Sequence, residues 1–116
     1  MEDIVADIEV RDRITEFKRV PSEELCGNDM NFRTHPQAQK HAFDGIVAEI
    51  GVAGALVAYY SERNDGKLTL IDGHMRKDRH KIDWPVLITD LDDEEADKLL
   101  LSYDPVGAMA IANQTK

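Results

Sequence analysis

A short apolar run that ends in a glycine is the feature that most constrains how this 116-residue chain folds. Residues 68–72 read as a strand, Gly73 follows, and the polar sequence 74–81 reads as the first turns of a helix. The first N–H groups of a helix have no partner within the helix, and the helix dipole favours an anion beside them. Gly73 lets the backbone approach a ligand closely, and His74 and Arg76 add donors next to it. The junction therefore predicts a small cradle for a phosphate or a carboxylate.

The plainer alternative is that Gly73 only turns the chain and that the charges after it are solvated, because glycine punctuates many junctions that bind nothing. Asp72 has two interpretations of the same kind. It can accept a proton or hold Mg²⁺ beside a phosphate, or it can bond to the N–H groups of its own turn. Glu49 is the second candidate catalytic acid, and its plainer interpretation is an exposed residue near a helix end.

Apolar periodicity and chain breakers predict strands that share one sheet, with helices between them. The predicted strands are one or two segments within 1–20, then 55–60, 67–72 and 86–90; the predicted helices are 37–50, 74–82, one opening at Asp92, and 106–112. Asp65-Gly66 is a favoured turn pair and predicts a hairpin between two of these strands. Asp92 is expected to cap its helix, whose first turn is rich in acids.

Two features of this plan concern packing. Ala42, Ile46, Val47 and Ile50 share a face at helical spacing, which predicts that the helix 37–50 packs against the sheet. The pair Trp84-Pro85 is interpreted as a break in the chain before the last strand.

The length fits one domain, assigned to residues 1–104, with a helical extension at 105–116. No apolar run approaches the roughly 18 residues that a membrane span needs, and the N-terminus lacks the blocks of a signal peptide. The single cysteine, Cys26, excludes an internal disulfide. These observations predict a cytoplasmic protein with no membrane partner.

The net charge of −9 argues against a protein that coats DNA non-specifically, because phosphate contacts need Lys and Arg. Six acids between residues 90 and 97 supply most of this excess, so a local basic patch over 76–81 remains compatible with the composition. Acids in a helix first turn are interpreted as a solvated helix start, with a metal-binding cluster as the alternative.

Metal binding by histidine is not the preferred interpretation. The four histidines form two pairs, His35 with His41 and His74 with His80, each six residues apart. Six residues on a helix turn through about 600°, which puts the members of a pair on different faces. A site that bridges His35 and His74 stays geometrically open, but no metal is predicted. Cys26 is interpreted as an inert thiol in a loop.

The motif Ile71-Asp72-Gly73-His74-Met75-Arg76 resembles the centre of the ParB/sulfiredoxin superfamily, where a strand ends in a Gly-X-X-Arg-type turn that binds nucleotide phosphates. In these domains an Asn-X-Arg segment, a helix with its glycine, a Pro-Leu-Val strand and a later strand surround the motif. Their counterparts here are residues 31–37, 46–51, 55–57 and 84–90. The resemblance covers about residues 20–110, and the segment 104–110 is similar to the end of ParB-like domains found with phage or bacterial DNA methyltransferases.

The resemblance implies an α+β fold, a small mixed sheet with helices packed around it. It implies a nucleotide, CTP or ATP with Mg²⁺, at the turn Gly73-His74-Met75-Arg76. The residues implied to contact it are Arg33, His35, Gly51, Gly73, His74 and Arg76. It also places Glu49 as an acid beside the pocket, while Asp72 is the candidate catalytic base because of its position before Gly73. We expect the side chains of Arg33, His35, His74 and Arg76 to converge on one pocket.

The chain departs from its relatives at chemically important positions. Sulfiredoxin-like proteins carry the reactive cysteine inside the Gly motif, where this chain has His74, so sulfinic-acid reduction is not supported. ParB proteins that hydrolyse CTP carry Glu-Arg-Arg after the motif glycine, and here only Arg76 matches. No Asp-Pro-Pro-Tyr run or Gly-rich S-adenosylmethionine loop is present.

The favoured hypothesis is a nucleotide- or phosphate-binding ParB-like domain, accessory to DNA modification or another DNA-associated process. DNA would be reached through a partner or a neighbouring domain, and a homodimer is an expected assembly. The alternatives are a small nuclease or kinase that uses Asp72 as base, and a protein–protein adaptor with a vestigial pocket.

Overall fold

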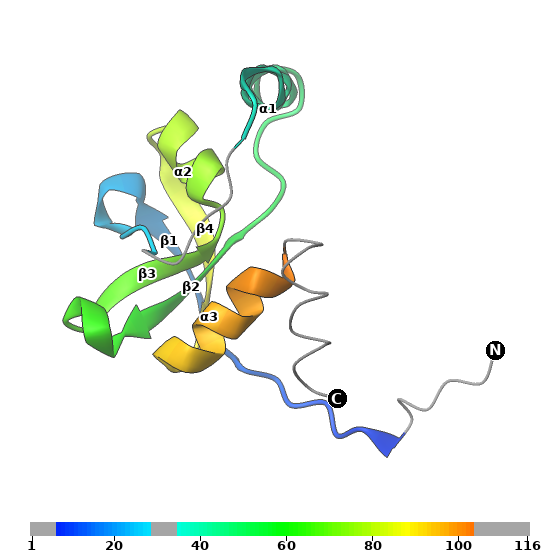
Figure 1. Cartoon of the computed structure of the whole chain (residues 1–116). Helices are drawn as coiled ribbons and strands as arrows, with labels where there is room; N and C mark the ends of the chain where they lie inside the picture. Colours follow the sequence, from blue (N-terminus) through cyan, green and yellow to red (C-terminus); the bar gives the residue numbers. More distant parts are fainter. Residues whose placement is uncertain (1–6, 29–34, 104–116) are drawn as a thin grey trace.

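The computed structural model describes residues 7–28 and 35–103 (Figure 1). Their helices and strands, in order, are β1 (Ile14–Pro21), α1 (Gln37–Glu49), β2 (Leu56–Ser61), β3 (Lys67–Asp72), α2 (His74–Arg79), β4 (Asp83–Thr89) and α3 (Asp93–Ser102). Two short 3₁₀ turns, η2 (Ser22–Glu24) and η3 (Glu62–Asn64), follow β1 and β2. The predicted helix 106–112 and the predicted extension 105–116 lie outside the described residues.

The strands form one mixed sheet in the order β1-β4-β2-β3. The central pair, β2 and β4, is parallel, and each outer strand is antiparallel to its neighbour. The parallel pair needs a crossover, which β3 and α2 supply between β2 and β4. The predicted α+β class with a small mixed sheet is confirmed.

The hairpin predicted at Asp65-Gly66 is present and joins β2 to β3. Asp65 has a φ of 57° and Gly66 a φ of 75°, both in the left-handed region that an Asp-Gly pair tolerates. The N–H of Gly66 donates to the Ser61 carbonyl at 2.7 Å. Local turn chemistry therefore sets the register that brings Asp72 to the sheet end.

Each face of the sheet has its own apolar cluster. On one face Leu56, Ala58, Leu70, Trp84, Val86 and Ile88 are buried together with Val20 and Leu25. On the other face α3 packs against β2 and β3, and Ala96 and Leu100 are buried beside Tyr59 and Ile71 (Figure 1). The sheet thus lies between α3 and the layer that carries the Gly73 turn.

The predicted cap of α3 is confirmed, and its acids serve the fold. Asp92 accepts from the Glu95 N–H at 2.8 Å, and the Glu95 carboxylate accepts from the Asp92 N–H, which is a capping box. Asp93 accepts from the hydroxyls of Tyr59 at 2.8 Å and Ser61 at 2.5 Å. These hydrogen bonds lower the Asp93 pKa, the Ser61 bond most, and fasten the start of α3 to β2.

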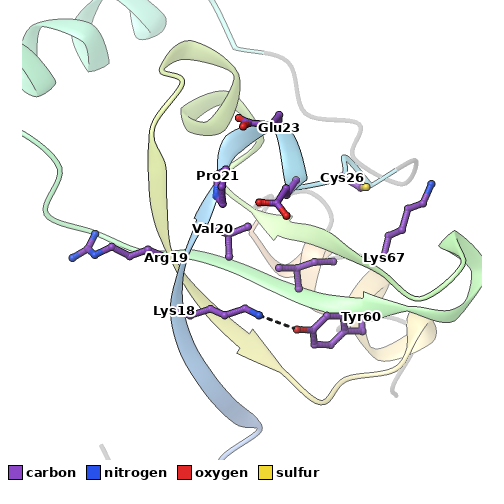
Figure 2. Close-up of a pocket in the computed structure, with 10 residues that line it drawn as sticks. Lys18, Arg19, Val20, Pro21, Glu23, Cys26, Tyr60 and Lys67 are labelled. Atoms are coloured by element: carbon purple, nitrogen blue, oxygen red, sulfur yellow. Dashed lines mark hydrogen bonds between the residues drawn. The ribbon is translucent and has the colours of Figure 1, made fainter.

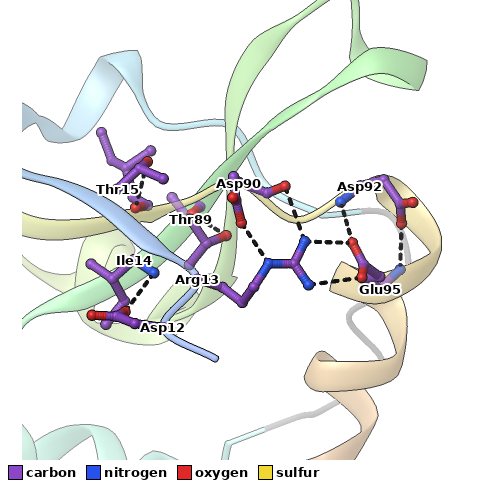
Figure 3. A network of polar contacts seen from close by, with 10 residues as sticks. Asp12, Arg13, Ile14, Thr15, Thr89, Asp90, Asp92 and Glu95 are labelled. Atoms are coloured by element: carbon purple, nitrogen blue, oxygen red, sulfur yellow. Dashed lines mark hydrogen bonds and ion pairs between the residues drawn. The ribbon is translucent and has the colours of Figure 1, made fainter. Parts of the chain in front are cut away.

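Arg13 fastens the same end of α3 to the start of β1 (Figure 3). Its guanidinium donates to Asp90 at 2.7 Å and to both carboxylate oxygens of Glu95, at 2.9 and 3.1 Å. The Arg13 hydrogen bond, followed by the Asp92 N–H, lowers the Glu95 pKa to about 2. The acid-rich turn is therefore occupied by internal partners.

The packing prediction for the helix 37–50 was wrong. None of the residues of α1 is buried, and its main contacts are with α2. Phe43 reaches the core cluster, but Ile46 and Ile50 are exposed. The half-buried face is the one that carries Phe43 and Asp44, because Arg79, the last residue of α2, and His80 after it are partners for Asp44.

The predicted break at Trp84-Pro85 was also wrong, since both residues belong to β4 and are buried. The Ser22 N–H donates to the Ile82 carbonyl, and this pair continues the register of the β1–β4 ladder. Hydrogen-bonded pairs alternate along an antiparallel ladder, so the β4 residues that bond to β1 are the even-numbered ones. Pro85 faces the other side, one residue before β2 begins to pair at Val86. Its missing N–H therefore interrupts no ladder.

None of the described helices combines the length and apolarity that a bilayer span requires.

The acid dependence of stability tests the Arg13–Glu95 contact. Since the Glu95 pKa is lowered from 4.5 to about 2 in the fold, its contribution is complete above about pH 4.5 and is lost as pH falls towards 2. In Glu95→Gln, we expect the free energy of unfolding to fall less steeply than in wild type over that window. Chemical denaturation at stepped pH measures this slope.

The matched control is Glu94→Gln, an exposed acid in the same helical turn. It should keep the wild-type slope. Equal slopes for wild type and Glu95→Gln would show that Arg13 does not hold the Glu95 carboxylate in solution.

Candidate functional site

Gly73 is the residue that sets the geometry of the strand–helix junction. It is the N-cap of α2 with a φ of 112° and a ψ of 18°, a conformation that side chains other than glycine rarely adopt. A Cβ at this position would overlap Leu56 Cδ2 and lie 3.2 Å from Leu56 Cβ and Cγ. The glycine is therefore required twice, by its dihedral angles and by its close approach to β2.

Arg76 lies in the first turn of α2 and bridges two backbone segments. Its Nη2 donates to Asp72 Oδ2 at 3.0 Å, and its Nη1 donates to the Ala55 carbonyl at 3.5 Å. Both side chains of the ion pair are about one-quarter exposed. The described structure thus gives Asp72 a role as the acceptor that orients Arg76 at the turn.

A cavity of about 310 Å³ opens beside Arg76, between the end of α1 and the start of β2. Its walls are mainly apolar and are formed by Phe43, Ile46, Ile50, Gly51, Val52, Ala53, Gly54, Arg76 and Trp84. Gly54 brings the backbone close to the guanidinium, because a Cβ there would lie 3.8 Å from Arg76 Nη1. One cation thus lies at the rim of an apolar space next to the Gly73 turn.

His74 contacts the loop on the other side of the turn. Its Nε2 accepts from the Asn28 N–H at 3.0 Å, and Gly27 lies close to its ring. This bond uses His74 to hold the loop that follows Cys26. That role was not anticipated in the sequence, because His74 and Asn28 are 46 residues apart in the chain.

The other predicted residues are distributed around this region. Gly51 ends α1 with a φ of 97° and lines the cavity. His35, two residues before α1, bonds to Gln39 of α1 at 2.9 Å, and Glu49 is the exposed last residue of α1. Arg33 lies outside the described residues. The convergence of Arg33, His35, His74 and Arg76 on one pocket stays a prediction, as do the catalytic roles of Asp72 and Glu49.

An ionic cluster between α1 and α2 was missed in the sequence. The Asp44 carboxylate accepts from the Arg79 guanidinium and from His80 Nε2, the latter at 2.9 Å, while Phe43 meets the His80 ring edge-on at 5.5 Å. The Arg79 hydrogen bond is the main cause of the lowered Asp44 pKa. We call Asp44, Arg79 and His80 the clasp, because it holds α1 over the cavity.

The basic residues of 76–81, which the composition allows to form a local patch, are largely neutralised by internal partners. Arg76 pairs with Asp72, Lys77 with Asp78 at 3.4 Å, and Arg79 with Asp44. Within residues 7–28 and 35–103, no group of three or more His, Cys, Asp or Glu side chains is arranged to hold a metal ion.

A larger cavity, about 610 Å³, lies on the same sheet face near the β2–β3 hairpin (Figure 2). Lys18 Nζ donates to Tyr60 Oη across it at 3.5 Å. Its rim mixes basic residues with Glu23 and Glu24, so its charge does not select one sign of ligand. Cys26 lies at this rim, in the segment after η2, where an isolated β-bridge pairs it with Thr69 of β3.

Comparison with known proteins gives structural neighbours only, since no family model and no curated protein sequence matches the chain. The truncated chromosome-partitioning protein ParB from Caulobacter crescentus in complex with CTP-γ-S has a TM-score of 0.65 and 20% identity over 79% of this chain. Sulfiredoxin from Arabidopsis thaliana has a TM-score of 0.58 and 17% identity over 74%. The Caulobacter ParB bound to its centromeric parS site has a TM-score of 0.57 and 18% identity over 72%.

The lengths of these proteins differ from the length of the aligned region. The alignment spans 98% of the sulfiredoxin chain but only 54% and 44% of the two ParB chains. The TM-scores of 0.57 to 0.65 show that the chain has the ParB/sulfiredoxin-type fold.

Substitution of Gly73 tests the close packing of the turn on Leu56. Gly73→Ala should lower the free energy of unfolding by about 2–4 kcal/mol, because it combines a disfavoured φ with overpacking. Gly45→Ala is the contrasting variant: Gly45 lies within α1 with no atom near its missing Cβ, so alanine there should stabilise by about 0.5–1 kcal/mol. Denaturant unfolding of both variants measures the contrast, and a neutral Gly73→Ala would contradict it.

Proposed function

We propose that this domain binds a nucleotide, with its phosphates at the turn Gly73-His74-Met75-Arg76 and its base or ribose in the 310 Å³ cavity. The observation that carries the proposal is the position of Arg76, which belongs to the turn and to the cavity wall at once. A guanidinium can contact two phosphate oxygens while the N–H groups at a helix start hold a third. The apolar walls suit the uncharged part of a nucleotide.

The comparisons support this proposal at the level of the fold, because one neighbour is a ParB protein in complex with CTP-γ-S. CTP is accordingly the first ligand to test, and ATP the second. Since another neighbour is bound to parS DNA, we propose that this chain also serves a DNA-associated process, such as DNA modification. With a net charge of −9 and with its α2 cations paired, it would reach DNA through a partner or a neighbouring domain.

The role of Asp72 separates a binding module from an enzyme. Mg²⁺ in nucleotide sites is bound by one or two carboxylates together with phosphate oxygens, and Asp72 is the carboxylate next to the turn. Because Asp72 accepts from Arg76, we propose that it orients the guanidinium, and that catalysis by Asp72 as a nuclease or kinase base is the alternative. An adaptor that binds no nucleotide is the third reading.

Calorimetry with CTP and ATP, with and without Mg²⁺, tests the role of Arg76. Arg76→Ala should weaken binding roughly tenfold to a hundredfold, since charge-assisted hydrogen bonds contribute about 1.5–3 kcal/mol each. Lys77→Ala is the matched control, because its side chain points about 100° away on the helix and pairs with Asp78. If Arg76→Ala binds nucleotide with wild-type affinity, the turn is not a phosphate site and the adaptor hypothesis is favoured instead.

Asp72→Asn distinguishes the roles of the carboxylate. The amide oxygen still accepts from Arg76 but carries no charge, so nucleotide binding without Mg²⁺ should be kept or strengthened. If Asp72 holds Mg²⁺ or acts as a base, the same variant should lose the Mg²⁺-dependent part of the affinity, or any phosphate release that wild type shows.

A further inference from the structure

The outer edge of β1 is an exposed strand edge, separate from the candidate site. Among the described residues β1 pairs on one side only, with β4, whereas the opposite sheet edge, β3, is partly covered by the bridge to Cys26. β1 also carries exposed apolar side chains, with Phe17 59% and Ile14 48% exposed. An uncovered strand edge with an exposed aromatic residue is a template for another strand.

The backbone groups directed at this edge follow from the β1–β4 ladder. The bond from the Ser22 N–H to the Ile82 carbonyl fixes even-numbered residues of β1 as those that bond to β4. Phe17 and Arg19 therefore direct their N–H and C=O groups outward. Near the bulge between Ile14 and Glu16, the Ile14 N–H is already satisfied by Asp12 Oδ1 at 2.9 Å, so the usable edge is centred on Phe17.

The charges on β1 select the partner. We propose that the β1 edge pairs antiparallel with β1 of a second copy of this chain, about a two-fold axis at Phe17. In that register Phe17 faces Phe17 of the partner subunit, and Glu16 faces Lys18 of the partner subunit twice by symmetry. Side chains opposite each other must lie on the same sheet face, so the two strands can slide only in steps of two residues. Each such step moves the two-fold axis by one residue, to Glu16 or to Lys18. Those registers put Glu16 or Lys18 opposite its own copy, which like charges disfavour.

The pairing joins two four-stranded sheets into one of eight strands and exchanges two backbone hydrogen bonds at Phe17. It also extends an apolar surface. Phe17 lies opposite Leu87 in the β1–β4 register, on the sheet face where α3 covers β2 and β3. The Lys18 bond to Tyr60, at 3.5 Å, is long enough to yield to a carboxylate of the partner. The interface is separate from the Gly73 turn and does not depend on nucleotide binding.

Charge reversal tests the proposed register in the whole chain, without reference to any ligand. Glu16 and Lys18 are exposed, so the substitutions leave the core intact. In Glu16→Lys the edge carries two cations, and in Lys18→Glu it carries two anions, so each variant should dimerise at least about tenfold more weakly than wild type. The double variant Glu16→Lys/Lys18→Glu restores opposite charges and should dimerise within about threefold of wild type.

Mixing provides a second readout. An equal mixture of the two single variants should form a heterodimer, because the two cations of one edge then face the two anions of the other. Sedimentation equilibrium over a range of concentrations measures wild type, the two single variants, the double variant and the mixture, with thermal unfolding as the check that each variant is folded. A wild-type monomer at every concentration, a dimer that ignores both single substitutions, or a double variant as weak as the single ones would each overturn the proposal.

Discussion

The contact of Gly73 with Leu56 is the constraint on which the rest of this site depends. Leu56 is fully buried at the start of β2, where the parallel pairing with β4 begins, and it fills the space that a side chain at position 73 would need. Because the turn presses on the central strand pair, the direction of α2 is fixed by the core. The position of Arg76, one turn later, is therefore set by packing and is oriented further by Asp72.

The two longer helices are held by different forces. α3 buries Ala96 and Leu100 against the sheet, and its capping box, Asp93 and Glu95 add hydrogen bonds to strands and to Arg13. α1 buries no residue and is held by the clasp and by Phe43. Ion pairs between exposed groups contribute little to stability and are screened by salt. The cavity beside Arg76 thus has one wall fixed by the core and one wall held mainly by charge.

Local signals in the sequence were sufficient for the elements that depend on neighbouring residues. The Asp65-Gly66 hairpin, the strand 67–72 and the Asp92 cap follow from turn and cap chemistry, and the structure confirms them. The errors concern long-range partners. The apolar residues of α1 suggested burial against the sheet, but Asp44 finds Arg79 and His80, 35 and 36 residues away, and turns a different face inward. Pro85 suggested a break in the chain, but it is tolerated within β4 because its missing N–H lies before the first residue that pairs with β2.

The same limit applies to the site. The strand–glycine–helix junction that carries Gly73 and Arg76 could be predicted because its strand, glycine and basic helix start are contiguous in the chain. The contact of His74 with the Asn28 N–H and the cavity wall from Phe43 to Gly54 depend on how distant segments fold together. The α1 wall is attached through the clasp. Low pH, which protonates Asp44, and high salt, which screens the ion pair, should therefore each loosen α1 before they disturb the Gly73 turn. The rigid half of the site is the half that the sequence motif encodes, and the α1 half is the one through which solution conditions act on it.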